Sequence, residues 1–89
     1  MNLTRYEARL RDLPCAVGHA LGLGCRCEEL HHAGDATDRD DWNQIPVCRT
    51  HHQGPQGIHP SRRAFENRTK LTEMKLLAVT RKLYAMRYE

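Results

Sequence analysis

The stretch CRCEELHHAG, residues 25–34, places two cysteines, two adjacent carboxylates and two adjacent histidines within ten positions. Read as a β-strand, residues 25–32 alternate between two faces, which puts His31 on one face and His32 on the other. Because these two imidazoles point in opposite directions, one site cannot use both in the same role. The doublet therefore predicts two different functions for its two histidines.

The chain is short and poor in apolar residues. Of its 89 residues, 39% are apolar, and its aromatic residues are one Trp, three Tyr and one Phe. A domain of this length buries about 60–65% of its unfolded surface, so apolar burial does little more than offset the loss of chain entropy. We expect a metal ion or a partner to stabilise the fold.

Thiols and imidazoles are concentrated in the middle of the chain. All four cysteines and all six histidines lie between residues 15 and 59. Residues 1–14 contain no apolar run of secretory length, so we expect thiolates that bind metal in a reducing cytoplasm rather than a disulfide framework. No apolar run is long enough to span a membrane.

The sequence CRTH, residues 48–51, is the clearest zinc half-site, because Cys48 and His51 have the spacing of a chelating pair. Its complement must come from residues 15–27. On a regular strand the thiolates of CRC would lie about 6.5–7 Å apart, so they suit one ion only if the chain turns there. The predicted structural zinc shell is Cys15, Cys27, Cys48 and His51. Cys25 and His19 stay open as competing ligands or as members of a second site.

A second set of polar side chains remains when this shell is filled. Its members are His31, His32, His52, His59, Glu29, Asp41 and Asn43. Hydrolysis of a phosphodiester needs a metal ion with an open coordination position, a base that activates water and a group that orients the base. The second set contains residue types for all three roles.

These residues resemble a known family. ELHH (29–32), followed by Asn43, His52 and His59, resembles the HNH nucleases, and ELHH itself resembles the strand of the bacteriocin DNases. The longer context, EELHHAG with DDWNQIPVCRTHHQGPQGIH and RRAFE, is similar to phage and prophage nucleases of the recombination-enhancement type, which depend on RecA. The resemblance implies a small, zinc-stabilised α+β fold with a ββα-metal (HNH) motif, much irregular loop and a long C-terminal helix.

The resemblance also implies residue roles. His32 is the implied general base, Asn43 would pin the loop or orient that base, and Asp41 would assist by a hydrogen bond. The implied ligands of the catalytic ion are His31, His52 and His59. The step from His52 to His59 crosses two glycines and a proline, so His59 reaches the site only if this loop folds back.

We expect a single domain in three parts. These are an N-terminal helix or arm (1–14), a zinc-binding HNH core (15–60) and a basic amphipathic helix (61–89) packed on the core. Within the core we expect a loop, a strand, a second loop and an edge strand limited by Pro46, at 15–24, 25–32, 33–41 and 42–48. Residues 61–89 begin at a capping serine and contain no glycine or proline, which predicts one uninterrupted helix.

Residues 60–89 carry eight bases and three acids. This excess is compatible with a solvated helix face or with contacts to phosphate, for which Arg62 and Arg63 are the candidates. Together with the resemblance, it implies a metal-dependent DNA endonuclease or nickase of phage or prophage origin, linked to recombination in the cytoplasm of a bacterial host. The implied cofactors are a structural Zn²⁺ and a catalytic Mg²⁺, Mn²⁺ or Zn²⁺. DNA is the implied substrate, and a RecA-type filament or another recombination protein is a candidate partner.

Two other interpretations stay open. If all the cysteines and histidines serve two structural zinc ions, the chain is a non-catalytic module that docks on nucleic acid or on a recombination protein. A small interaction adaptor, held together by its long helix, would need neither catalysis nor a second ion.

Overall fold

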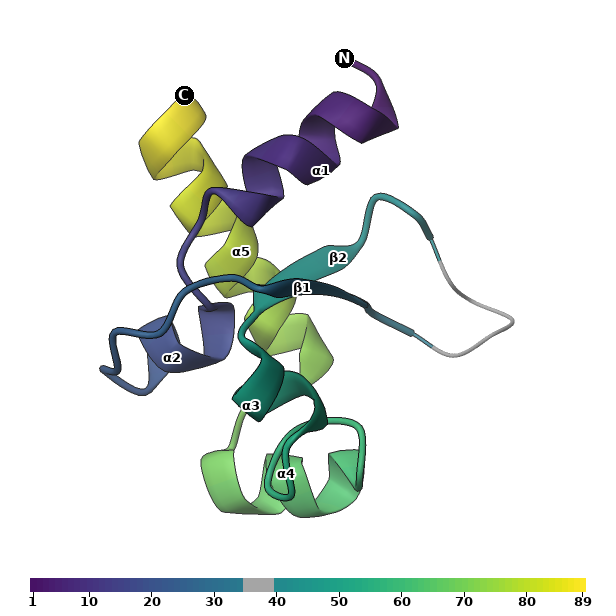
Figure 1. Ribbon diagram of the computed structural model, residues 1–89, viewed down its shortest axis with the longest axis vertical. Helices are drawn as coiled ribbons and strands as arrows, with labels where there is room; N and C mark the ends of the chain where they lie inside the picture. The colour runs from purple at the N-terminus through teal and green to yellow at the C-terminus, as the bar shows by residue number, and fades with distance from the viewer. Residues whose placement is uncertain (35–39) are drawn as a thin grey trace.

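A computed structural model describes residues 1–34 and 40–89, which form a small α+β fold around a two-stranded sheet (Figure 1). The strands are β1 (Glu29–His32) and β2 (Gln44–Val47). The helices are α1 (Leu3–Arg11), α2 (Ala16–Ala20), α3 (Arg49–Gln53), α4 (Arg62–Thr69) and α5 (Glu73–Tyr88). Residues 35–39 belong to the loop predicted between the strands and lie outside the described residues.

The sheet places the histidine doublet at the end of β1. The strands are antiparallel, with His31 opposite Ile45 and His32 opposite Gln44. His31 is buried, whereas the His32 side chain is 30% exposed, so the two histidines differ in environment as the alternation predicted. Pro46 lies within β2. It is tolerated because β2 pairs only with β1 among the described strands, and its outer edge needs no N–H donor.

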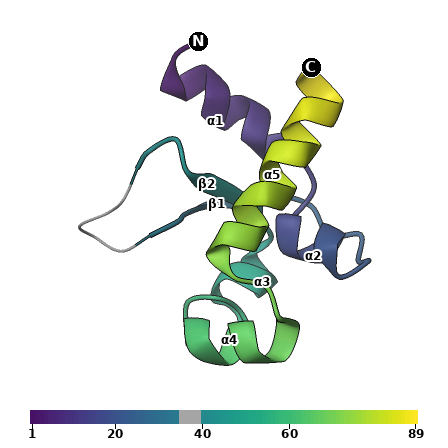
Figure 2. The ribbon, with the colours of Figure 1, turned by 180° about the vertical axis from the view of Figure 1, so that it is seen from behind.

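The hydrophobic core lies where α2, β2 and α5 meet. Val17, Val47 and Leu76 are buried there, and α5 lies across the sheet (Figure 2). Helix α1 contacts both strands and packs a second cluster against α5 through Leu10 and Leu83. The sheet is therefore held between helices that come from both ends of the chain.

The C-terminal segment is two helices, not the single helix predicted for residues 61–89. Helix α4 ends at Thr69 and is capped by Lys70, which adopts a left-handed conformation with φ of 62°. Thr72 caps the start of α5 by accepting from the Lys75 N–H. The break lets Phe65 of α4 and Leu76 of α5 enter the same core cluster. In the described ranges, no helix is both long and apolar enough to cross a membrane.

The segment before β1 also differs from prediction. The loop expected at residues 15–24 contains α2, whose N-cap is Cys15 and whose residues Ala16 and Val17 are buried. The strand expected at 25–32 begins only at Glu29, and an isolated bridge joins Arg26 to Pro14. The chain therefore turns back toward α2 before it enters the sheet.

Candidate metal centres

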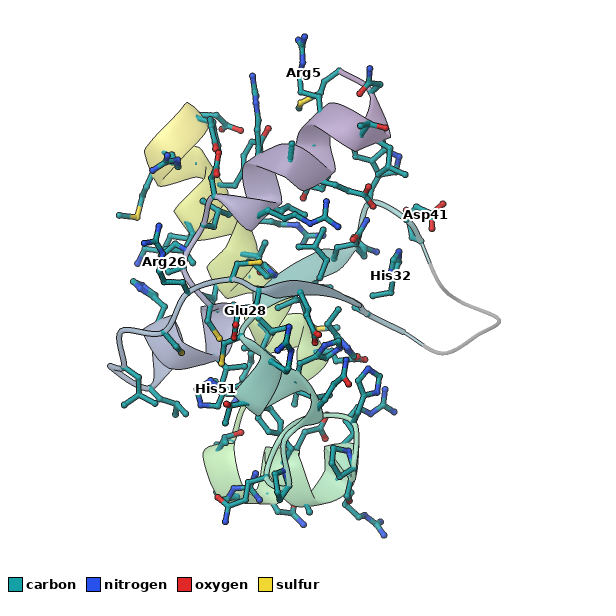
Figure 3. The ribbon with its side chains drawn as sticks, in the orientation of Figure 1. Arg5, Arg26, Glu28, His32, Asp41 and His51 are labelled. Atoms are coloured by element: carbon teal, nitrogen blue, oxygen red, sulfur yellow. The ribbon has the colours of Figure 1, made fainter. Side chains whose placement is uncertain are left out.

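Three thiols converge on one imidazole at the junction of α2 and α3. The Sγ atoms of Cys15, Cys25 and Cys48 lie 3.6, 3.4 and 3.2 Å from Nδ1 of His51, respectively. All four ligand atoms lie within 4.8 Å of one another. We call this group, Cys15, Cys25, Cys48 and His51, the cysteine centre; Figure 3 shows His51 beside the sulfur atoms between α2 and α3.

Two helix starts hold the centre in place. Cys15 and Cys48 are the N-caps of α2 and α3, and their sulfur atoms accept from the backbone N–H groups of Gly18 and His51, at 3.3 and 3.4 Å. Such donors, together with the helix dipole, stabilise a thiolate. Cys25 is brought in by the turn after α2, because the Cys15 N–H donates to the Cys25 carbonyl at 3.1 Å.

The donor set fits zinc. In a tetrahedral shell with ordinary Zn–S and Zn–N bonds, two sulfurs lie about 3.8 Å apart, and a sulfur and a nitrogen lie about 3.5 Å apart. The three sulfur–nitrogen distances here, 3.2–3.6 Å, match that spacing. Burial, together with hydrogen bonds and repulsion from Cys15 and Cys48, raises the pKa of Cys25 to about 12. A dication bound at this centre would stabilise the Cys25 thiolate.

The structure corrects one predicted zinc ligand, since Cys25 takes the position that the sequence assigned to Cys27. The Cys27 sulfur instead donates to the Glu29 carbonyl at 3.3 Å. His19 is exposed and lines a cavity together with Cys25, but it is not among the four clustered ligands. The prediction of a regular strand from residue 25 was wrong. Strand geometry therefore could not indicate which of Cys25 and Cys27 joins the cysteine centre. Gly18 offered a signal: an added Cβ there would overlap Cys25 Sγ, so only glycine admits this thiol.

A second group forms where β1, α3 and the following loop meet. His31, His52 and His59 have ring centroids 4.4–5.2 Å apart, and one nitrogen from each lies within 4.8 Å of the others. Nδ1 of His31 is 3.1 Å from Nε2 of His52. We call these three residues the histidine centre. The structure thus brings together the three imidazoles that the resemblance implied.

The loop between His52 and His59 does fold back. The N–H groups of Ile58 and His59 donate to the carbonyls of His51 and His52, each at 2.9 Å. This return requires Gly57, where a Cβ would stand 2.8 Å from the His51 carbonyl oxygen. The spacing in the sequence was therefore compatible with a common site.

His31 and His52 each have one ring nitrogen that faces the other histidine and a second nitrogen that faces a carboxylate outside the centre. Glu29 Oε1 lies 2.8 Å from Nδ1 of His52, and Glu73 Oε2 lies 2.5 Å from Nε2 of His31. Glu73 also accepts from the Gly34 N–H at 3.1 Å and from Arg62 at 2.9 Å. Carboxylates that orient histidines in this manner are typical of metal sites. No motif in the sequence indicated Glu73.

These contacts decide which ring nitrogens carry protons. Burial lowers the pKa of His31, and the contact with Glu73 only partly reverses that effect. Burial alone would raise the pKa of Glu73, but hydrogen bonds from His31 and Gly34 outweigh it, so the carboxyl is ionised. The Glu29 pKa is also lowered, chiefly by its hydrogen bond with His52. If the outward nitrogens of His31 and His52 both donate to carboxylates, their other two nitrogens both carry lone pairs, and these face each other across 3.1 Å. A cation between them removes that repulsion.

A cleft of about 370 Å³ opens beside the histidine centre. It is lined by His31, His32, Gly34, Ile58, His59, Arg62 and Glu73. Nε2 of His32 lies 3.6 Å from the Asp41 carboxylate, and Figure 3 shows these two side chains facing each other where the two strands continue into their loop. Residues from β1, α4 and α5 therefore share one opening to solvent.

The remaining predicted residues differ in how close they lie to this cleft. The Asn43 carbonyl accepts from the Ala33 N–H at 2.9 Å, which closes the base of the loop, and its side chain contacts Arg81 at 3.4 Å. It thus ties the loop together, while the structure shows no bond from it to His32. Arg62 lines the cleft. Arg63 is exposed on α4 and is not among the lining residues.

Compared with protein-family models, with curated proteins and with solved structures, the chain matches none of them.

Proposed function

We propose that the protein is a metal-dependent DNA endonuclease or nickase of the HNH type, in which β1, β2 and α3 form the ββα-metal motif. The observation that carries the proposal is the histidine centre: three imidazoles converge beside a cleft that also contains His32. A site with three protein ligands and an open side is the arrangement of a catalytic metal rather than a structural one.

The residues around the cleft divide the chemistry among them. A divalent ion held by the histidine centre would supply a Lewis acid for the phosphate and its leaving oxygen. His32 accepts the proton of the attacking water, and Asp41, whose carboxylate lies 3.6 Å from Nε2, orients the ring. Nδ1 of His32 is then the nitrogen that takes the proton.

Two carboxylates position the metal ligands, and an arginine positions the substrate. Glu29 and Glu73 hold the rings of His52 and His31 so that their other nitrogens face inward. Arg62 lines the cleft while one of its nitrogens pairs with Glu73. Its remaining donors suit a phosphate, and the exposed Arg63, the next residue of α4, is a second candidate for a phosphate contact.

The cysteine centre has a different task in this proposal. It joins the starts of α2 and α3 and so fixes the helix that carries His52. A structural zinc there would stabilise a chain with a small apolar core. The proposed substrate is DNA, and the proposed partner is a RecA-type filament or another recombination protein. The proposed location is the cytoplasm of a phage-carrying bacterium.

The direct test is nicking of supercoiled plasmid by the zinc-loaded protein with Mg²⁺, Mn²⁺ or Zn²⁺ added, with and without a RecA filament. We expect wild-type protein to nick, and His32→Ala to lose about 10²- to 10⁴-fold in rate, the usual contribution of a general base. His19→Ala is the matched control, because that histidine is exposed outside both centres. Equal rates for wild type and His32→Ala would remove His32 as the base.

The burial of His31 and His52 favours one alternative, a non-catalytic module with two structural metal ions. Metal exchange separates the alternatives. One chelator-resistant ion and one exchangeable ion support the enzyme, whereas two resistant ions without nicking under any condition support the module.

A further inference from the structure

Trp42 is unusually exposed for the only tryptophan of the chain. Its side chain and backbone together retain 44% of their accessible surface. Its ring packs on Tyr6 of α1, with centroids 5.1 Å apart, and Tyr6 in turn lies 5.3 Å from Tyr84 of α5. A row of three aromatic rings therefore runs from the surface into the junction of α1 and α5, helices that lie side by side in Figures 1 and 2.

A cavity of about 350 Å³ adjoins this row. It is lined by Tyr6, Arg81, Tyr84, Ala85 and Glu89. The aromatic walls offer stacking faces, Arg81 offers a guanidinium, and Glu89 offers an acceptor for an N–H group of a base. A flat heterocycle with N–H donors fits these walls better than a phosphate does, because the Glu89 carboxylate repels an anion.

A basic side chain from each helix contacts this region. Arg81 of α5 lines the cavity, and Arg9 of α1 donates to the Tyr84 hydroxyl at 3.0 Å. Arg81 is exposed and Arg9 is half-buried. Aromatic rings beside an exposed base are the common arrangement of surfaces that bind single-stranded nucleic acid, where bases stack and phosphates contact cations.

The aromatic row is also joined to the proposed catalytic cleft. Trp42 directly follows Asp41, which contacts His32, and precedes Asn43, which contacts Arg81. Along α5, Arg81 is eight residues beyond Glu73 of the cleft, a rise of about 12 Å. One DNA strand could therefore reach both places.

We infer that Trp42, Tyr6 and Arg81 form a stacking site for an unpaired nucleobase, next to the phosphodiester that the cleft would hold. The location of that phosphodiester rests on the proposed function. The substrate class that follows is DNA with a single-stranded segment, such as a flap, a gap or a displaced strand, rather than continuous duplex.

The test uses protein that carries one equivalent of zinc, with no further metal added, and a denaturing gel checks that the DNA stays intact, so that binding is measured apart from cleavage. A dye-labelled oligothymidylate and a duplex of equal length are titrated separately and followed by fluorescence anisotropy. We expect Trp42→Ala to weaken single-strand binding by about fivefold to 150-fold, the range for loss of one stacked base. We expect Trp42→Phe to retain most of the affinity and duplex binding to change little.

Trp42 also provides a direct signal, because it is the only tryptophan. Its fluorescence should be quenched by the unlabelled oligothymidylate in wild type and in His32→Ala alike. Equal single-strand affinity of wild type and Trp42→Ala, with both proteins folded by circular dichroism, would overturn the stacking site. So would quenching by a proline-rich peptide and none by the oligonucleotide, which would assign this surface to a protein partner.

The two proposals can fail separately. If no metal supports nicking but single-strand binding still depends on Trp42, the stacking site stands and the nuclease proposal fails. If His32-dependent nicking is observed and Trp42→Ala binds and cuts single-stranded and duplex DNA as wild type does, the stacking site alone fails.

Discussion

Glu73 lies 2.5 Å from Nε2 of His31 although 42 residues separate them in the chain. This contact joins the N-terminal turn of α5 to the end of β1. The same carboxylate accepts from the Gly34 N–H, so it holds both the imidazole and the backbone just after the strand. A residue far outside the ELHH motif thus determines which nitrogen of His31 faces the centre.

Replacing Glu73 by Gln should weaken metal binding at the histidine centre. The amide keeps the size of the side chain but removes the charge that fixes the His31 tautomer. Loss of such an orienting carboxylate lowers metal affinity by about 10- to 100-fold. Competition with a chromogenic chelator measures the effect, and Glu66→Gln on α4 is the control outside the centre. Unchanged affinity in Glu73→Gln would show that the contact does not orient a ligand.

The sequence motifs contained most of this site, including Glu29, but not the second carboxylate, Glu73. The predicted metal ligands lie in the short motifs ELHH and CRTHH and at His59. Neighbouring elements bring them together, because β1 pairs with β2 and α3 begins directly after β2. Glu73 had no such signal, because an acidic residue in the first turn of a helix is ordinary. Its role depends on where α5 crosses the sheet, which is a consequence of packing.

The helix break at Lys70 escaped prediction for a related reason. Lys70 is neither glycine nor asparagine, and propensity alone favours continuing the helix through it. The left-handed conformation, at φ of 62°, is maintained because the Lys70 N–H caps the Glu66 carbonyl and Phe65 and Leu76 share one core cluster. Tertiary packing overrides the local preference there.

The two neighbouring cysteines provide a matched pair of variants. Cys25→Ser removes a ligand of the cysteine centre, so we expect loss of tight zinc and of cooperative thermal unfolding by circular dichroism. Cys27→Ser keeps a group that can donate to the Glu29 carbonyl, so we expect near-wild-type zinc content and stability. The reverse outcome would restore Cys27 to the zinc shell and contradict the structure.

Gly18→Ala should disturb the cysteine centre without changing a ligand. The new Cβ would overlap Cys25 Sγ, so this thiol must move away from His51. We expect zinc affinity to fall by about tenfold or more, as for other changes just outside a metal shell. Gly24→Ala is the control, since its Cβ would enter open space. Equal zinc affinity in the two variants would show that Cys25 does not need this close approach.

Zinc binding at the cysteine centre should become tighter as the pH rises. The pKa of Cys25, raised to about 12 mainly by burial, keeps this thiol protonated in the metal-free protein at neutral pH. Zinc binds the thiolate, so binding must release that proton, and a lower proton concentration favours the bound state. Calorimetric titration with zinc at pH 7, in two buffers with different ionisation enthalpies, measures the protons released. Cys25→Ser should release fewer protons than wild type. A binding heat independent of the buffer would mean that the thiols are already ionised before the metal arrives.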